Sequence, residues 1–148
     1  MTIAIRRANV GDLETLLPLV QRYRVFYKQK PDAQRERAFI QERLERGTSI
    51  IFLACIDERA VGFAQLFDLA SGVNLGIEYV LGDLFVEPNA RRNGVATKLL
   101  ARAVDHARRS SATGLFLETA IDNATAQAVY ERSGWRRESR FLKYNATL

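Results

Sequence analysis

The sequence predicts one domain of the α/β (α+β) class, in which helices cover both faces of a mixed β-sheet. Its 148 residues are enough to bury a core without disulfides or a metal. Hydrophobic residues make up 47% of the chain and charged residues 26%, as in ordinary globular domains. Segments with helical spacing of apolar residues alternate with strand-like segments, which indicates layers of helices packed on a sheet.

The first half of the chain predicts a strand followed by two helices. The strand covers residues 2–7, and the first helix starts at Asp12, an expected N-cap. Pro31 interrupts the chain, Asp32 caps the second helix, and Gly47 ends it. The apolar residues that this second helix is expected to bury are Phe39, Ile40 and Leu44.

The second half predicts most of the sheet. Three strands are expected, and a short polar turn joins the first two of them into a hairpin. A strongly amphipathic helix follows the third strand, and its single histidine, His106, is expected at the surface. In order, the predicted elements are strands 49–57, 61–69 and 77–86, helix 94–109, strand 114–120, helix 123–133 and strand 135–144.

Several classes of protein do not fit this composition. The single cysteine, Cys55, excludes a disulfide framework and a cysteine-cluster zinc site, and its apolar neighbours indicate a buried thiol. The N-terminus is charged too early for a secretory signal. No apolar run approaches the roughly 20 residues that cross a bilayer. We therefore expect a cytoplasmic protein with no membrane partner.

The net charge of +5 has two interpretations. It serves solubility, or it attracts an anionic partner such as a phosphorylated cofactor or a nucleic acid. The basic residues are spread along the chain and do not alternate with aromatic residues as they do in RNA-binding segments. We therefore expect no nucleic-acid partner, although charge alone does not decide this.

The loop of residues 87–94, which follows the predicted strand 77–86, predicts a phosphate site. Pro88 ends the strand, and a helix begins at Gly94 after a polar stretch. Helix N-termini present unpaired N–H groups and a partial positive charge, which favour phosphate. The chain contains neither of the two common glycine-rich nucleotide motifs. The predicted ligand is phosphorylated but is held in another way.

Two further segments carry residues of chemical interest. Gly82 and Asp83 are poor strand formers inside a strand, so Gly82 is either simply tolerated or marks a bulge that opens backbone groups to a ligand. Asn123 opens a helix, and Tyr130 follows two turns later. From spacing alone, Tyr130 is better explained as a core residue than as a catalytic one.

The two loop–helix segments together resemble the GCN5-related N-acetyltransferase (GNAT) superfamily. The superfamily's Gln/Arg-x-x-Gly-x-Gly/Ala motif is matched by residues 91–96. Its second signature is matched by Asn123, Ala126, Tyr130, Gly134 and Trp135. The resemblance covers most of the chain. Residues 26–32, Phe-Tyr-x-x-x-Pro-Asp, are similar to a bacterial and fungal subgroup related to histone and polyamine acetyltransferases.

The resemblance implies an acetyl-CoA-dependent N-acetyltransferase of one domain, residues 1–148, whose sheet splays between its fourth and fifth strands. A primary amine, small or peptidic, would attack the thioester directly in a ternary complex without a metal, and homodimers are common in the superfamily. Tyr130 corresponds to the residue that protonates the departing thiolate. The residues that the resemblance assigns to acetyl-CoA are Leu84, Phe85, Val86, Arg91, Arg92, Asn93, Gly94, Val95, Ala96, Thr97 and Asn123.

The general base and the acceptor site are less sharply defined. Relatives that act on small amines often have glutamate where this chain has Gly82, so Asp83 and Glu118 are the candidates for the base. Glu118 is favoured because a carboxylate on a central strand needs a partner or a function, with a salt bridge as an equal alternative. The expected acceptor residues are Tyr23, Phe26, Tyr27 and Asp32, of which Asp32 is better explained as a helix cap.

Three alternatives stay open at this point. Arg92 stands where the superfamily usually has glycine, and its charge either reaches a CoA phosphate or lies in solvent. The chain could also be a non-catalytic acyl-CoA-binding regulatory module that keeps the fold. A nucleic-acid-binding domain is the third hypothesis, and it requires an affinity that falls steeply with salt.

Overall fold

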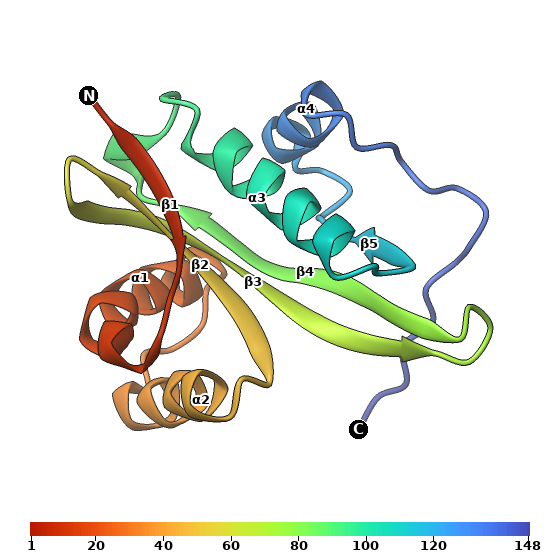
Figure 1. Cartoon of the computed structure of the whole chain (residues 1–148), viewed down its shortest axis with the longest axis horizontal. Helices are drawn as coiled ribbons and strands as arrows, with labels where there is room; N and C mark the ends of the chain where they lie inside the picture. Colours follow the sequence, from red (N-terminus) through yellow and green to blue (C-terminus); the bar gives the residue numbers. More distant parts are fainter. The chain divides into compact units, whose positions relative to one another are not determined.

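Five strands form one mixed sheet in the order β1-β2-β3-β4-β5 in the computed structural model, which describes residues 1–148 (Figure 1). All neighbouring pairs are antiparallel except β4 and β5, which are parallel. The strands are β1 (Ile3–Arg7), β2 (Ser49–Ile56), β3 (Arg59–Ser71), β4 (Gly76–Val86) and β5 (Gly114–Phe116). The chain divides into two compact units, Met1–Glu118 and Thr119–Leu148, and the sheet belongs to the first.

Helices cover both faces of the sheet within the first unit, as predicted. Helices α1 (Leu13–Phe26) and α2 (Ala33–Arg46) pack on one face, and α3 (Val95–Arg109) packs on the other (Figure 1). The core under α1 and α2 consists of Ala8, Leu16, Leu19, Val20, Ile40, Ile51, Leu53, Phe63 and Phe85, with a half-buried Cys55 packed against it. The opposite face receives the buried row of α3, which is Val95, Leu99, Leu100, Ala103 and Ala107.

The ends of α2 follow the prediction. Asp32 Oδ1 accepts a hydrogen bond from the Arg35 N–H at 3.1 Å, and Gly47 ends the helix in the left-handed conformation, with φ of 62°. The expectation of a buried Phe39 is wrong, because 46% of this residue is exposed. Ile40 instead faces the core, and the Phe39 ring lies under the guanidinium of Arg43 at 4.6 Å.

The start of α1 differs from the prediction, because Asp12 makes no side-chain cap on this helix. Its carboxylate accepts the Asn9 N–H at 2.9 Å and pairs with Arg6 at 2.6 Å. Asp12 therefore closes a capping box that begins at Asn9. Sequence spacing alone did not reveal that the preceding strand supplies an arginine for this carboxylate.

His106 is not the surface residue that the sequence predicts. Its ring is half-buried on α3 and lies against the rings of Phe52 and Tyr79, at 5.8 and 5.4 Å. Burial lowers the pKa of His106, and the nearby charges of Arg7 and Arg102 lower it further. The residue is a packing group between α3 and the sheet.

A bulge interrupts β4 at Gly82, as one of the two interpretations predicts. Leu81 pairs with Leu66 and Asp83 pairs with Gln65, which leaves Gly82 without a partner on β3. A Cβ atom on Gly82 would lie 2.6 Å from a ring carbon of Phe67. Glycine is therefore needed here for space, and the bulge sets the direction of the Asp83 side chain that follows.

The predicted splay between the fourth and fifth strands is present. Residues 78–80 of β4 pair with residues 114–116 of β5, but β4 continues to Val86. Residues 81–86 therefore have no strand beside them on this edge. The fifth strand ends at Phe116, four residues earlier than predicted, so the expectation of a strand through residue 120 is wrong.

The second unit, residues 119–148, contains one helix, α4 (Ala124–Arg132). Asn123 caps it by accepting the Ala126 N–H at 3.1 Å, and Gly134 follows its end with a φ of 90°. The predicted last strand is wrong, because residues 135–144 form no strand. Local hydrogen bonds occupy this segment instead: the Glu138 carboxylate accepts both the backbone N–H and the guanidinium of Arg140.

None of the helices has the length and apolar character that crossing a membrane requires.

Candidate active site

A cavity of about 530 Å³ lies between α1, α2 and the sheet. Its lining combines apolar side chains from the core with ionisable groups, and this combination is typical of small-molecule sites. The ionisable groups are the carboxylates of Asp32, Glu36, Glu42 and Asp83 and the guanidinium groups of Arg24 and Arg35. Arginines pair with Glu36, Asp32 and Glu42, so Asp83 is the lining carboxylate without an arginine partner, and it favours a cationic group beside it.

Asp83 brings a carboxylate from β4 to this cavity. Its Oδ2 accepts a hydrogen bond from Gln65 Nε2 at 2.7 Å. Burial raises the pKa of Asp83 above the usual aspartate value, while hydrogen bonds from Gln65 and Tyr23 act in the opposite direction. A carboxylate with a raised pKa in a cavity has the character of a general base.

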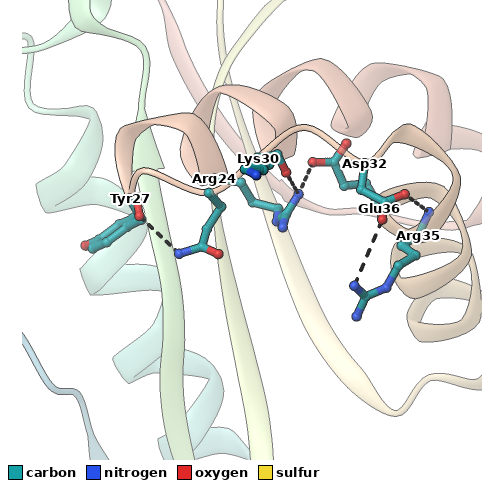
Figure 2. A network of polar contacts seen from close by, with 7 residues as sticks. Arg24, Tyr27, Lys30, Asp32, Arg35 and Glu36 are labelled. Carbon is teal, nitrogen blue, oxygen red and sulfur yellow. Dashed lines mark hydrogen bonds and ion pairs between the residues drawn. The ribbon is translucent and has the colours of Figure 1, made fainter.

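Polar residues of α1 and of the start of α2 also line the cavity, and they belong to a network of contacts around the connection between the two helices (Figure 2). Arg24 on α1 donates hydrogen bonds to the Lys30 carbonyl at 3.1 Å and to Glu36 Oε2 at 2.5 Å (Figure 2). The Glu36 side chain is only 2% exposed, and its Oε1 is buried without a hydrogen-bond partner. This part of the lining therefore holds a buried acceptor atom in addition to the carboxylate of Asp32.

An aromatic cluster, defined by Tyr23, Phe26 and Tyr27, lies at the end of α1. Tyr23 lines the cavity, and its ring contacts the rings of Tyr27 and Phe85 at 5.1 and 6.0 Å. Phe26 contacts Tyr27 at 5.3 Å, and both residues are about half exposed. Of the four expected acceptor residues, Tyr23 and Asp32 line the cavity, whereas Phe26 and Tyr27 are not part of its lining.

The open edge of β4 offers backbone hydrogen-bonding groups. The Glu87 N–H donates to the Val61 carbonyl at 2.8 Å. Because antiparallel strands alternate bonded and non-bonded pairs, the N–H and C=O groups of Leu84 and Val86 point away from β3. No strand lies on that side, so Leu84 presents an N–H and a C=O for an added strand-like ligand.

The loop of residues 91–94 ends directly at α3. Arg92 and Gly94 have positive φ angles, 66° and 83°, and loops of this kind form concave sites for anions. Gly94 is the N-cap and supplies no side-chain acceptor, so the first N–H groups of α3, on Val95, Ala96 and Thr97, lack a cap. The Asn93 side chain bonds the Ala90 carbonyl at 3.2 Å and supports the loop.

A family model described as "Acetyltransferase (GNAT) family" matches residues 13–135 of this chain. The chain belongs to the GNAT acetyltransferase family. It is 38% identical over 140 residues to the "Uncharacterized N-acetyltransferase YhfO" of Bacillus subtilis (strain 168). The aligned residues cover 95% of this chain and 94% of that protein.

Solved GNAT structures agree over the whole length of the chain. A crystal structure of a probable acetyltransferase has a TM-score of 0.91 and 37% identity, and covers 100% of this chain and 98% of that one. The structure of AAC(6')-Iy in complex with the bisubstrate analogue CoA-S-monomethyl-acetylneamine has a TM-score of 0.84 and 25% identity, and covers 100% of both chains.

The second GNAT signature lies on and around α4 in the second unit. The Tyr130 ring lies 6.5 Å from the Trp135 ring, and the Trp135 N–H donates to the Tyr130 carbonyl at 3.0 Å. Asn123 is the N-cap of α4, and its side chain is used in that bond. The cap is the part of the Asn123 prediction that is confirmed, while the contacts of Asn123 and Tyr130 with acetyl-CoA stay predictions.

The structure separates the two candidate bases. Asp83 lines the cavity, whereas Glu118 follows the end of β5, is exposed and is not part of the cavity lining. The reason that favoured Glu118, a carboxylate on a central strand, applies instead to Asp83. Sequence reasoning also missed Gln65, whose signal is a polar residue inside the apolar run of residues 61–69.

Proposed function

We propose that this GNAT protein transfers the acetyl group of acetyl-CoA to a primary amine that binds in the cavity, with Asp83 as the general base. One observation carries the proposal: Asp83 and Leu84 are consecutive on β4. Asp83 presents a carboxylate to the cavity, and Leu84 presents its backbone to the open edge. A base for an amine and a pairing edge for an extended ligand therefore meet at one point of the strand.

The cavity supports an amine acceptor. Its volume is in the range of small-ligand sites, and the Asp83 carboxylate, which pairs with no arginine, favours an ammonium group over an anion. Aromatic rings such as Tyr23 suit the aliphatic part of an amine and interact favourably with its positive charge. An ammonium group cannot attack until it loses a proton, and Asp83 accepts that proton. The acceptor class is a small amine or the amino group of a peptide.

The open edge and the loop support acetyl-CoA as the acetyl donor. The N–H groups of residues 95–97 would hold the pyrophosphate at the start of α3. The backbone of Leu84 and the N–H of Val86 would pair with the pantetheine amides. In the same arrangement, a main-chain N–H of β4 would stabilise the negative charge that develops on the thioester oxygen.

The reaction then balances without a metal. Asp83 takes one proton from the ammonium group, the free amine nitrogen bonds to the thioester carbon, the C–S bond breaks, and the second proton of the nitrogen leaves to solvent. Tyr130, in our proposal, gives its proton to the departing thiolate, because a phenol stays protonated at neutral pH. The products are an N-acetyl amine and CoA.

A thiol-release assay tests the proposal. Purified protein is incubated with acetyl-CoA and a panel of linear diamines, amino acids, aminoglycosides and basic peptides, and free CoA is measured. We expect amine-dependent release with at least one class. If acetyl-CoA binds, as measured by calorimetry, but no amine raises CoA release above background, the non-catalytic acyl-CoA-binding module becomes the correct description. Binding of duplex DNA that weakens steeply with salt would favour the third hypothesis.

A further inference from the structure

Two buried polar side chains lie behind Asp83, and the proposed reaction gives neither of them a role. Gln65 on β3 is 1% exposed, and Ser49 at the start of β2 is 5% exposed. The Ser49 hydroxyl donates to Gln65 Oε1 at 2.6 Å, and Gln65 Nε2 donates to Asp83 Oδ2 at 2.7 Å. The three side chains form a relay across three neighbouring strands.

Polar groups this deeply buried cost stability unless they are satisfied, and a core built for stability alone would hold apolar residues here. Gln65 also has a defined direction. Its carbonyl end is occupied by the Ser49 hydroxyl, so its amide N–H end faces Asp83. An N–H donor stabilises the ionised carboxylate, whereas a carbonyl in its place would stabilise the protonated acid.

We infer that Gln65, held by Ser49, is a positioning residue that fixes the Asp83 carboxylate against β3 and keeps it ionised in a cavity where burial favours the acid. This inference rests on the proposed role of Asp83 as the base. The other titratable or charged groups around the cavity are Tyr23 and Arg24 on α1 and Asp32, Arg35, Glu36 and Glu42 on α2. Of these, the Tyr23 hydroxyl donates to the main-chain carbonyl of Gly82, directly before Asp83, at 3.4 Å, and Tyr23 also lowers the pKa of Asp83.

Two variants test the relay with different risks to folding. The double variant Ser49→Ala/Gln65→Leu leaves no buried hydroxyl unpaired, so its cost in stability is confined to the hydrogen bond that Asp83 loses. Gln65→Glu keeps the size of the side chain and the acceptor for Ser49, but places a second carboxylate beside Asp83. Ser71→Ala, at the other end of β3, is the matched control, because its hydroxyl only accepts the Asn74 N–H.

The primary measurement is the titration of Asp83 by carbon-13 NMR of its carboxyl carbon, without substrates. We expect its midpoint to rise by about one pH unit or more in the double variant, because a hydrogen bond to a charged group is lost. The rise is larger in Gln65→Glu, since two adjacent carboxylates share one proton. The acid limb of the kcat/KM profile of the enzyme moves to higher pH by the same amount.

A titration midpoint that stays at the wild-type value in every folded variant overturns the inference, whatever the activity. A purely structural role predicts the same result, with lower activity but an unmoved pH profile. If the titration midpoint of Asp83 moves but no amine is acetylated, the inference about Gln65 holds and the proposed function is contradicted instead. The two failures are therefore distinguishable.

Discussion

Arg91 Nε donates a hydrogen bond to the main-chain carbonyl of Val86 at 2.9 Å and joins the loop of residues 91–94 to the last residue of β4. The same guanidinium lies over the Phe26 ring at 5.4 Å and the Phe85 ring at 6.0 Å. Through this bond of its Nε, Arg91 ties the loop to the edge of β4. Contact of Arg91 with acetyl-CoA stays a prediction.

Replacing Arg91 tests this link. We expect Arg91→Met to weaken acetyl-CoA binding about tenfold, because a hydrogen bond from a charged group is lost and the loop is no longer tied to Val86. Calorimetry with acetyl-CoA measures the effect. Arg109→Met, which removes a guanidinium paired with Asp105 at the other end of α3, is the matched control. Equal binding by both variants would show that the link does not matter for the ligand.

Two substitutions of Arg92 separate the effect of its backbone conformation from the effect of its charge. Its φ of 66° is unfavourable for a residue with a side chain, so we expect Arg92→Gly to raise the free energy of unfolding by about 1 kcal/mol. Urea denaturation measures this change, and Arg92→Met is the control that removes only the charge. If the charge reaches a CoA phosphate, both variants bind acetyl-CoA more weakly, with a smaller dependence on salt. A lower free energy of unfolding for Arg92→Gly would show that the positive φ of Arg92 does not cost stability.

The pKa of Asp83 predicts the pH dependence of activity. Because burial raises this pKa, the acid limb of the rate profile lies above the usual titration range of aspartate, and activity falls as the pH falls through it. The raised pKa also means that the folded protein binds this proton more readily than the unfolded chain. The ionised carboxylate therefore reduces stability at neutral pH, and this cost disappears as the pH falls.

The variant Asp83→Asn tests both the role of Asp83 as the base and the stability cost of its charge. We expect kcat/KM to fall by about 100-fold or more, while the free energy of unfolding at neutral pH stays the same or rises. Steady-state kinetics and urea denaturation measure the two quantities. Glu118→Gln is the competing variant: a large loss of kcat in Glu118→Gln together with an active Asp83→Asn would assign the base to Glu118.

Phe39 is predicted to act on the acceptor and not on the fold. It is half-exposed and lines the cavity, so Phe39→Ser should change the free energy of unfolding by less than about 1 kcal/mol while raising KM for the amine severalfold. The neighbouring Ile40→Ala is the contrast, because this fully buried residue should cost about 2–5 kcal/mol. A large loss of stability in Phe39→Ser would contradict the placement of its ring.

Tyr130→Phe removes one hydroxyl and keeps the ring that lies near Trp135. As a general acid, Tyr130 should contribute about 100-fold to kcat, and its loss should leave the affinity for acetyl-CoA unchanged. Stopped-flow detection of the released thiol measures the step. An unchanged kcat would return Tyr130 to the structural role that its spacing in the sequence favoured.

The sequence was most informative where one residue type is required by backbone geometry. Gly47 and Gly94 have positive φ angles, and Gly82 has no room for a Cβ atom, so each marks a turn, a cap or a bulge that can be recognised in advance. The strands and helices of the first unit were predicted from a second signal, because apolar periodicity reports which face of an element is buried.

What could not be predicted depends on contacts between distant segments. The direction of Asp83 requires Gln65 and Ser49 on other strands, which no local pattern reveals. Phe39 and Ile40 are adjacent apolar residues on one helix, and only the packing of α2 decides which of them faces the core. The predicted strand after Trp135 failed because a strand needs a partner as well as a suitable composition.

Transfer of a labelled acetyl group is the most direct test of the central claim. The protein is incubated with acetyl-CoA that carries carbon-13 in its acetyl group, together with the amine that gives the fastest thiol release, and the amine is analysed by mass spectrometry. We predict one labelled acetyl group on the amine for each CoA released, with about 100-fold slower transfer by Asp83→Asn. CoA release without label on the amine, or equal transfer by Asp83→Asn, would contradict the account.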